Sequence, residues 1–163
     1  MALYTITDWL GLVPVVISMV FGGLGLLQLV KRKSFLEVDR DIIFLGIYYI
    51  VVILGYLIFE MIPINCRPIL IEGRLEASYP SSTTLLVLSI MPTLTLQVKQ
   101  RSKNRLFKKI IRIFAIFFSA FMVLGRLISG VHWVTDIVGA ALLSAGLFLL
   151  YKASVSLHHR SKN

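Results

Sequence analysis

Residues 110–151 read IIRIFAIFFSAFMVLGRLISGVHWVTDIVGAALLSAGLFLLY, two long apolar runs joined by a short polar segment. Each run approaches the roughly 20 residues that a helix needs to cross a hydrocarbon core about 30 Å thick. Three further apolar runs lie at about 9–30, 42–63 and 80–98. Because backbone N–H and C=O groups cannot stay unpaired in lipid, all five runs are expected to be helices. The sequence therefore predicts an all-α integral membrane protein, a bundle of about five transmembrane helices in a single domain, residues 1–163.

The 17 Lys and Arg residues are distributed unevenly along the chain, which carries a net charge of +9. All but three of them follow the first, third or fifth apolar run, on one side of a chain that crosses the membrane five times. Because positively charged loops stay in the cytoplasm, this distribution predicts an N-terminus outside and a cytoplasmic C-terminus. The basic loop at 97–112 is then a topology signal in contact with anionic lipid, and nucleic-acid binding is not indicated.

Three arginines, Arg67, Arg74 and Arg126, remain on the opposite, outer side. Membrane topology does not require positive charge there, so binding of an anion at the outer face is the simplest explanation. A guanidinium is planar and always charged, which suits the oxygens of a phosphate group. For Arg74 there is an alternative, an ion pair within its own loop with Glu72 or Glu76.

An ionisable pair, His132 and Asp136, follows Arg126 in the segment GRLISGVHWVTDIVG, residues 125–139. Ionisable groups at membrane depth are usually functional and face a protein interior or an aqueous cavity. Positions i and i+4 share one helix face, so the carboxylate can hold the imidazole in one tautomer for nucleophilic attack. A buried polar pair that ties two helices together is the alternative interpretation. Neither a Cys nor a second His lies near His132 in the sequence, so no metal site and no cofactor is predicted.

Residues 80–84, Pro-Ser-Ser-Thr-Thr, directly precede an apolar run. Proline in a first helical turn with hydroxyl residues around it is typical of a helix start. This helix and the one that begins at His132 are both expected to start at the outer face, near the three arginines. Helix N-termini carry free N–H groups and a positive dipole end, so the pair is suited to phosphate binding.

Three short motifs thus occur in order at the outer ends of the apolar runs. They are Glu60-x6-Arg67-Pro68, Pro80-Ser81-Ser82-Thr83 and Gly125-Arg126-x5-His132-x3-Asp136. In this order they resemble the motifs Lys-x6-Arg-Pro, Pro-Ser-Gly/Ser-His and Ser-Arg-x5-His-x3-Asp of the type 2 phosphatidic acid phosphatase (PAP2) family. The resemblance spans about residues 60–146, and it implies a phosphatase-like core at about 42–153.

The resemblance implies a metal-independent membrane phosphatase that acts on a lipid phosphate or diphosphate. His132, polarised by Asp136, would attack the phosphorus to give a phosphohistidine, which water would hydrolyse. The phosphoryl oxygens would be held by arginine and hydroxyl side chains: Arg67, Arg126, Ser81, Ser82, Thr83 and, in place of the missing Lys, Arg74.

Thr83 stands where the family has the His that protonates the leaving oxygen. A threonine cannot act as an acid near neutral pH, and general acid catalysis is typically worth about 10²–10⁴-fold. The loss matters less when the leaving group is a lipid phosphate, because that group is a weaker base than a lipid alkoxide. A polyprenyl diphosphate, for example undecaprenyl diphosphate, is therefore the better-suited substrate. Glu60, at the Lys position, repels phosphate unless it pairs with an arginine or lies outside the pocket.

Two other functions are compatible with the sequence. In a phosphotransferase, a lipid or sugar hydroxyl replaces water as the acceptor. A non-catalytic phospholipid-binding or transport protein would explain the loss of the Lys and the His from the family motifs, although it would not need a nucleophile held by a carboxylate. The predicted location is a cell membrane with the site facing outside, and the small size suits a bacterial cytoplasmic membrane.

Overall fold

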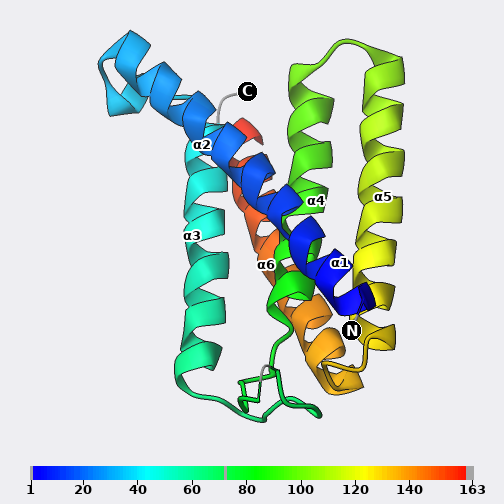
Figure 1. Ribbon diagram of the computed structural model, residues 1–163. Coiled ribbons are helices and arrows are strands. Elements are labelled where there is room, and N and C mark those ends of the chain that lie inside the picture. Colours follow the sequence, from blue (N-terminus) through cyan, green and yellow to red (C-terminus); the bar gives the residue numbers. More distant parts are fainter. Residues whose placement is uncertain (1, 72, 161–163) are drawn as a thin grey trace.

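The computed structural model describes residues 2–71 and 73–160, which form a bundle of α-helices (Figure 1). Within these residues the chain has no β-strand, apart from two isolated bridges in one loop. The helical elements are α1 (Ala2–Leu10), α2 (Leu12–Arg32), the short 3-10 helix η1 (Phe35–Glu37), α3 (Arg40–Met61), α4 (Ser82–Arg101), α5 (Arg105–Ile128) and α6 (Val134–Arg160). The predicted all-α bundle is confirmed.

Four stretches of the described chain are long and apolar enough to cross a membrane. The first stretch is formed by α1 and α2 taken together, with a mean hydropathy of 2.3. The others are α3, with 2.7, α5, with 2.0, and α6 as far as Leu157, with 1.8. The fifth predicted run, at 80–98, is also a helix, α4, and it is the most polar of the five. The protein is therefore a multi-pass membrane protein in which one helix differs in character from the others.

Helix α4 is polar because it lies inside the bundle, where it packs against α2, α3, α5 and α6. Its buried side chains include several hydroxyl and amide groups: Thr83, Thr84, Ser89, Thr93 and Gln97. Neighbouring helices pair with this polar surface. The Tyr48 hydroxyl donates to the Ser89 carbonyl at 3.1 Å, and Gln97 Nε2 donates to the Tyr151 hydroxyl at 3.0 Å. A helix that is enclosed by protein does not need an apolar surface for lipid.

The first apolar run, predicted at about 9–30, consists of two helices that are separated at Gly11. Helix α1 packs beside α5, whereas α2 crosses the bundle towards α3 and α4 (Figure 1). The contact between α1 and α5 is tight, since a Cβ added to Gly125 would lie 2.6 Å from Thr7 Cγ2. Gly11 keeps helical backbone angles, φ −59° and ψ −18°, so α1 continues the line of α2 and carries its side chains to the C-terminal end of α5 (Figure 1).

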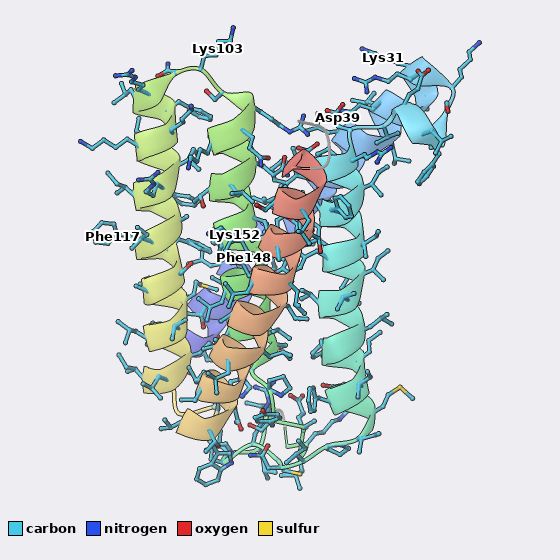
Figure 2. The ribbon with its side chains drawn as sticks, turned by 180° about the vertical axis from the view of Figure 1, so that it is seen from behind. Lys31, Asp39, Lys103, Phe117, Phe148 and Lys152 are labelled. Carbon is cyan, nitrogen blue, oxygen red and sulfur yellow. The ribbon has the colours of Figure 1, made fainter. Side chains whose placement is uncertain are left out.

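The two ends of the bundle differ in what they carry. One end, here called the basic end, holds Lys31, Asp39 and Lys103, which are labelled in Figure 2. The opposite end, here called the loop end, holds the long loop 62–81 and the connection 129–133 between α5 and α6 (Figure 1). The sequence motifs of interest all lie at or near the loop end.

Hydrogen bonds between its own backbone groups hold the loop 62–81 in shape. The Arg67 amide donates to the Glu76 carbonyl, and the Ser78 amide donates to the Asn65 carbonyl, both at 3.0 Å. These hydrogen bonds place two strand-like halves of the loop side by side below the bundle.

The surface of the bundle carries large apolar side chains, whereas a close contact inside it depends on a glycine. Large apolar side chains cover the outside, as a lipid-facing surface requires. Phe117 of α5 is 71% exposed and points outward in Figure 2. Inside, the loop lies very close to Gly139 of α6, since a Cβ there would lie 2.2 Å from the Tyr79 ring. The absence of a side chain at Gly139 allows loop 62–81 to rest directly on α6.

Candidate active site

The chain brings the second and third sequence motifs together at the loop end. Arg126 lies near the end of α5, His132 lies in the connection 129–133, and Asp136 lies in the first turn of α6. Ser81 is the N-cap residue of α4, and its amide donates to the Asp136 carbonyl at 3.2 Å. This hydrogen bond joins the N-terminal ends of α4 and α6.

The two ring nitrogens of His132 have different surroundings. Nδ1 lies 3.1 Å from the Ser78 carbonyl, 3.2 Å from the Ser78 hydroxyl and 3.5 Å from Asp136 Oδ2. With acceptors on this side, the ring proton belongs on Nδ1. Nε2 is buried and has no hydrogen-bond partner. Its lone pair is therefore free to bond to a ligand.

Asp136 is fully buried and is held by several donors. Asn65 Nδ2 donates to Oδ1 at 3.0 Å, the Trp133 amide donates to Oδ2 at 2.9 Å, and the Ser78 hydroxyl also donates to Oδ2. These three donors fix the orientation of the carboxylate. The carboxylate thus faces His132 both directly and through the Ser78 hydroxyl.

Arg126 is 2% exposed, and its guanidinium is shared between α1 and α4. Nη2 donates to Asp8 Oδ1 at 2.9 Å and also to the Thr83 hydroxyl. The Tyr4 ring lies against the guanidinium, with Cζ 5.0 Å from the ring centroid. Nε and Nη1 are buried and have no hydrogen-bond partner. One side of the guanidinium is thus satisfied by the protein, and the remaining donors are not.

Arg67 is the other motif arginine, and it also keeps unused donors. Its Nε lies 3.2 Å from Glu76 Oε2, which makes an ion pair. The Nε–H group is not directed at this oxygen, so the contact is an ion pair without a hydrogen bond. Nε and Nη1 are therefore both buried donors without a hydrogen-bond partner. The side chain of Arg67 is 12% exposed, so water has little access to these groups.

Buried polar atoms normally have hydrogen-bond partners. At the loop end of the described structure an unusual number do not: Asn65 Oδ1, Arg67 Nε and Nη1, Ser81 Oγ, Thr84 Oγ1, Arg126 Nε and Nη1, and His132 Nε2. Two guanidinium groups and two hydroxyls in this set can donate. A group of buried donors beside a free imidazole nitrogen is suited to an anion with several oxygens, such as a phosphoryl group.

The electrostatic surroundings keep His132 neutral. Burial lowers the pKa of His132 to about 4, and the positive charges of Arg67 and Arg126 act in the same direction. The Asp136 carboxylate and the Ser78 carbonyl oppose this decrease without cancelling it. His132 is therefore an unprotonated base at neutral pH, which is the form in which an imidazole can act as a nucleophile.

Ser82 and Thr83 line a cavity of about 360 Å³ between the α1–α2 break, α3 and α4. Most of its remaining walls are apolar and come from three helices: Leu12, Val52, Ile53, Leu85 and Leu86. Asp8 lies at the same cavity, next to its ion pair with Arg126. An apolar cavity thus adjoins the buried arginine.

Two residues that the motifs singled out lie apart from this cluster. Arg74 is exposed in a tight turn at 71–74, and its side chain makes no hydrogen bond or ion pair with the cluster. Glu60 is exposed in the last turn of α3 and forms no ion pair with Arg67 or Arg126, whose carboxylate partners in the described structure are Glu76 and Asp8. Glu76 pairs with Arg67 rather than with Arg74, and Glu72 lies outside the described residues.

Four contacts at the site were not anticipated from the motifs: those made by Asp8, Asn65, Glu76 and Ser78. Asp8 has a sequence signal, since it is the first acidic residue of the chain and the next one is Glu37. Ser78 and Asn65 are ordinary polar residues of a loop, and nothing in their sequence surroundings distinguishes them. Within residues 2–71 and 73–160, no group of three or more His, Cys, Asp or Glu side chains is placed to hold a metal ion.

Comparisons with known proteins place this geometry in a family. The sequence model of the PAP2 superfamily matches residues 42–160. A similar solved structure is a transmembrane PAP2-type phosphatidylglycerolphosphate phosphatase from Bacillus subtilis, with a TM-score of 0.63 and 22% sequence identity, covering 91% of this chain and 77% of that one. Comparison with curated protein sequences gives no match. Because the family model covers most of the chain, including all three motifs, this protein belongs to the PAP2 superfamily.

Proposed function

We propose that this protein is a membrane lipid phosphatase that works through a phosphohistidine on His132. The observation that carries the proposal is the environment of that imidazole. Nδ1 is held by Ser78 and Asp136, whereas the buried Nε2 has no partner. An oriented, neutral imidazole with one free nitrogen has the form that nucleophilic catalysis requires.

In the first step, the Nε2 lone pair of His132 forms a bond to phosphorus, and the bond from phosphorus to the leaving oxygen breaks. The electron pair of that bond departs with the lipid leaving group. The imidazole becomes positively charged while its Nδ1–H stays directed at the Ser78 carbonyl, and the Asp136 carboxylate stabilises this charge. In the second step, water attacks phosphorus, the P–N bond returns its electron pair to Nε2, and inorganic phosphate and a proton are released.

The phosphoryl oxygens are bound by Arg67, Arg126 and Ser81. Their buried N–H and O–H groups without partners support this role. Phosphoryl transfer depends mainly on positioning and on stabilisation of charge on these oxygens. Donors that are already fixed before the substrate arrives do not need to reorganise during the reaction.

The preferred substrate is a lipid diphosphate, such as a polyprenyl diphosphate. Thr83 pairs with Arg126 and cannot supply a proton to the leaving oxygen,. A departing lipid phosphate needs that proton less than a departing alkoxide. The name of the Bacillus subtilis protein refers to phosphatidylglycerolphosphate, a phosphate monoester, so a monoester lipid is the informative competitor. The apolar cavity of about 360 Å³ beside Thr83 would take the first part of the lipid tail.

The site faces the extracytoplasmic side of the membrane, in the outer leaflet of a bacterial cytoplasmic membrane. The distribution of charge supports this orientation. The loops at 33–39 and 102–104 and their flanking helix ends carry most of the basic residues, at the end opposite to His132. Positively charged segments stay on the cytoplasmic side.

Phosphate release by the purified protein in detergent tests the proposal, with a polyprenyl diphosphate and phosphatidate offered separately. We expect faster release from the diphosphate and a loss of at least about 10³-fold in His132→Ala, since a nucleophile cannot be replaced by its neighbours. Acid-labile radioactive phosphate should remain on the wild-type chain after rapid quenching, and not on the variant. Equal release by wild type and His132→Ala would falsify the mechanism, and faster release from phosphatidate would contradict the substrate preference.

The same assay separates the alternatives. A phosphotransferase would pass the phosphoryl group to an added alcohol in preference to water, so glycerol would decrease free phosphate and yield glycerol phosphate. A lipid-binding protein without activity would bind the diphosphate and release no phosphate from either lipid.

A further inference from the structure

Asp8 is an acidic residue of α1 that reaches the buried guanidinium of Arg126. Its Oδ1 lies 2.9 Å from Arg126 Nη2, and its own side chain is 58% exposed. Helix α1 is fixed nearby, because Thr7 is fully buried against Gly125 and the Tyr4 ring covers the guanidinium. The backbone of Asp8 is thus held in place, whereas its carboxylate has room to rotate into the surroundings.

The hydrogen bonds of Arg126 show what this carboxylate does to the site. An Nη2 nitrogen carries two hydrogens, and Asp8 and Thr83 are the acceptors that Nη2 contacts. A guanidinium grips a phosphate with two parallel N–H groups, which come from Nη2 together with either Nε or Nη1. Nε and Nη1 have no partner. Both pairs of N–H groups that could bind a phosphate include Nη2, however, so neither pair is available while Asp8 and Thr83 accept the two Nη2 hydrogens.

We propose that Asp8 is a specificity-determining residue that competes with the substrate phosphate for Arg126. The proposal rests on the proposed role of Arg126 in phosphate binding. When a phosphoryl group enters, the exposed carboxylate of Asp8 rotates away, and Arg126 completes its grip with Nη2. When the product phosphate loosens, Asp8 returns, because α1 keeps it within reach at a high effective concentration.

The consequence is a site that binds free phosphate weakly although two buried arginines are present. Each arginine has a carboxylate beside it, Glu76 at Arg67 and Asp8 at Arg126. A substrate must offer more than a phosphate group to displace Asp8, and a lipid tail in the adjoining apolar cavity supplies that additional binding. Inorganic phosphate has no tail, so it is released.

Binding of inorganic phosphate to the purified full-length protein in detergent tests this proposal, with the increase of Tm over a phosphate titration as the readout. We expect Asp8→Asn and Asp8→Ser to bind phosphate at least about 10-fold more tightly than wild type, since a hydrogen bond to a charged group becomes available. Arg126→Ala in the Asp8→Asn background should remove the gain. Two substitutions are used so that poor folding of one does not decide the result.

Glu60→Gln is the matched control, because Glu60 lies at the same end of the bundle, is exposed and makes no contact with Arg126. It removes the same charge without freeing an Nη2 hydrogen, so its phosphate affinity should stay within about twofold of wild type. Unchanged or weaker binding in both Asp8 variants would overturn the proposal, as would an equal gain in Glu60→Gln.

Lipid turnover, measured in parallel, separates this proposal from the proposed function. If Asp8→Asn binds phosphate more tightly while neither it nor wild type hydrolyses a lipid, the competition by Asp8 stands and the phosphatase function fails. If lipid is hydrolysed and the phosphate affinity does not change, the competition fails and the function stands. If both hold, product inhibition by phosphate should also be stronger in Asp8→Asn.

Discussion

The basic end and the loop end of this bundle each contain an arginine among carboxylates, and they use it differently. At the basic end, Arg101 donates from Nε to Gln97 at 2.9 Å, from Nη1 to Asp39 at 3.2 Å and from Nη2 to Asp41 at 2.8 Å. At the loop end, Arg126 donates from Nη2 alone, and its Nε and Nη1 have no partner. Arg101 connects helices and uses its donors within the protein, whereas Arg126 keeps some free, as its proposed role in binding phosphate requires.

Burial makes this difference more pronounced. The side chain of Arg101 is 33% exposed, whereas that of Arg126 is 2% exposed. Unpaired donors at Arg101 could turn to water, but unpaired donors at Arg126 remain without a partner until a ligand arrives. The arrangement at the loop end is therefore less favourable in the empty protein, and we infer that it persists because it binds a phosphoryl group.

The largest expected difference between the two ends is in the response to a change from arginine to lysine. Arg126→Lys removes the planar fork at the site and should lower kcat/KM by about 10²–10³-fold, with little effect on Tm. Arg101→Lys removes hydrogen bonds between helices and should lower Tm by several degrees while kcat/KM stays within about twofold. Both quantities are measured on the same detergent preparations. Loss of activity in Arg101→Lys at an unchanged Tm would remove the distinction between the ends.

A smaller difference is expected between two glycines that lie at helix contacts. A Cβ at Gly139 would lie 2.2 Å from the Tyr79 ring, whereas a Cβ at Gly25 would lie 3.1 Å from the Cγ2 methyl group of Ile42. Gly139→Ala should therefore displace the loop next to Ser78, destabilise the protein by about 1–3 kcal/mol and decrease activity. Gly25→Ala should cost little, because a single methyl group has to shift. Equal decreases in Tm for the two variants would show that loop 62–81 does not depend on this contact.

The smallest expected difference between the two ends is in their response to acid. At the loop end, a decrease in pH should change activity. With a pKa of about 4, His132 stays unprotonated until well below the ordinary value near 6.5, so the acid limb of kcat/KM should lie near pH 4. Arg67→Gln removes a positive charge that lowers this pKa and should move the limb to higher pH. The pH profiles of wild type and Arg67→Gln are measured on the same substrate, so the titration of the lipid phosphate affects both equally. If the acid limb stays at the same pH in Arg67→Gln, the limb does not report the protonation of His132.

At the basic end the same acidification should act on stability instead. Burial raises the pKa of Asp39, but hydrogen bonds from Arg32, Gln28 and Arg101 outweigh this and lower it below 3.8. A carboxyl group with a lowered folded-state pKa contributes stability above its ordinary pKa, and this contribution is lost as the pH falls through the lowered value. Tm should thus decrease below pH 3.8 in wild type, and less so in Asp39→Asn.

Much of the fold could be predicted from local sequence, because partition into lipid depends on the composition of each segment. The five apolar runs are all helical in the structure, including 80–98, whose threonines and Gln97 made it the most polar. The position of α4 at the centre of the bundle explains that polarity, and the hydropathy pattern alone could not reveal it. The first apolar run was predicted as one helix, and in the structure only Gly11 separates α1 from α2, with helical backbone angles of its own.

The candidate site divides in the same way. The spacing of His132 and Asp136 was sufficient to predict their pairing, although His132 lies just before the first residue of α6 and not in the helix itself. Arg74 was expected at the site and lies exposed in a turn, since charge and membrane side do not define the direction of a loop side chain. Ser78 lies 54 residues from His132 and completes its hydrogen bonding, and no local pattern indicates such a contact.

The sequence by itself determined the membrane class, the helical runs and the motif order, because these follow from the hydrophobicity and spacing of nearby residues. Tertiary structure alone decided which charges meet. Asp8 reaches Arg126 across 118 positions, and Glu76 rather than Glu60 pairs with Arg67. Such contacts depend on how helices and loops pack, and packing is a property of the whole chain. For that reason the sequence could single out His132, the proposed nucleophile, but not Asp8, the carboxylate that we propose competes with the substrate for Arg126.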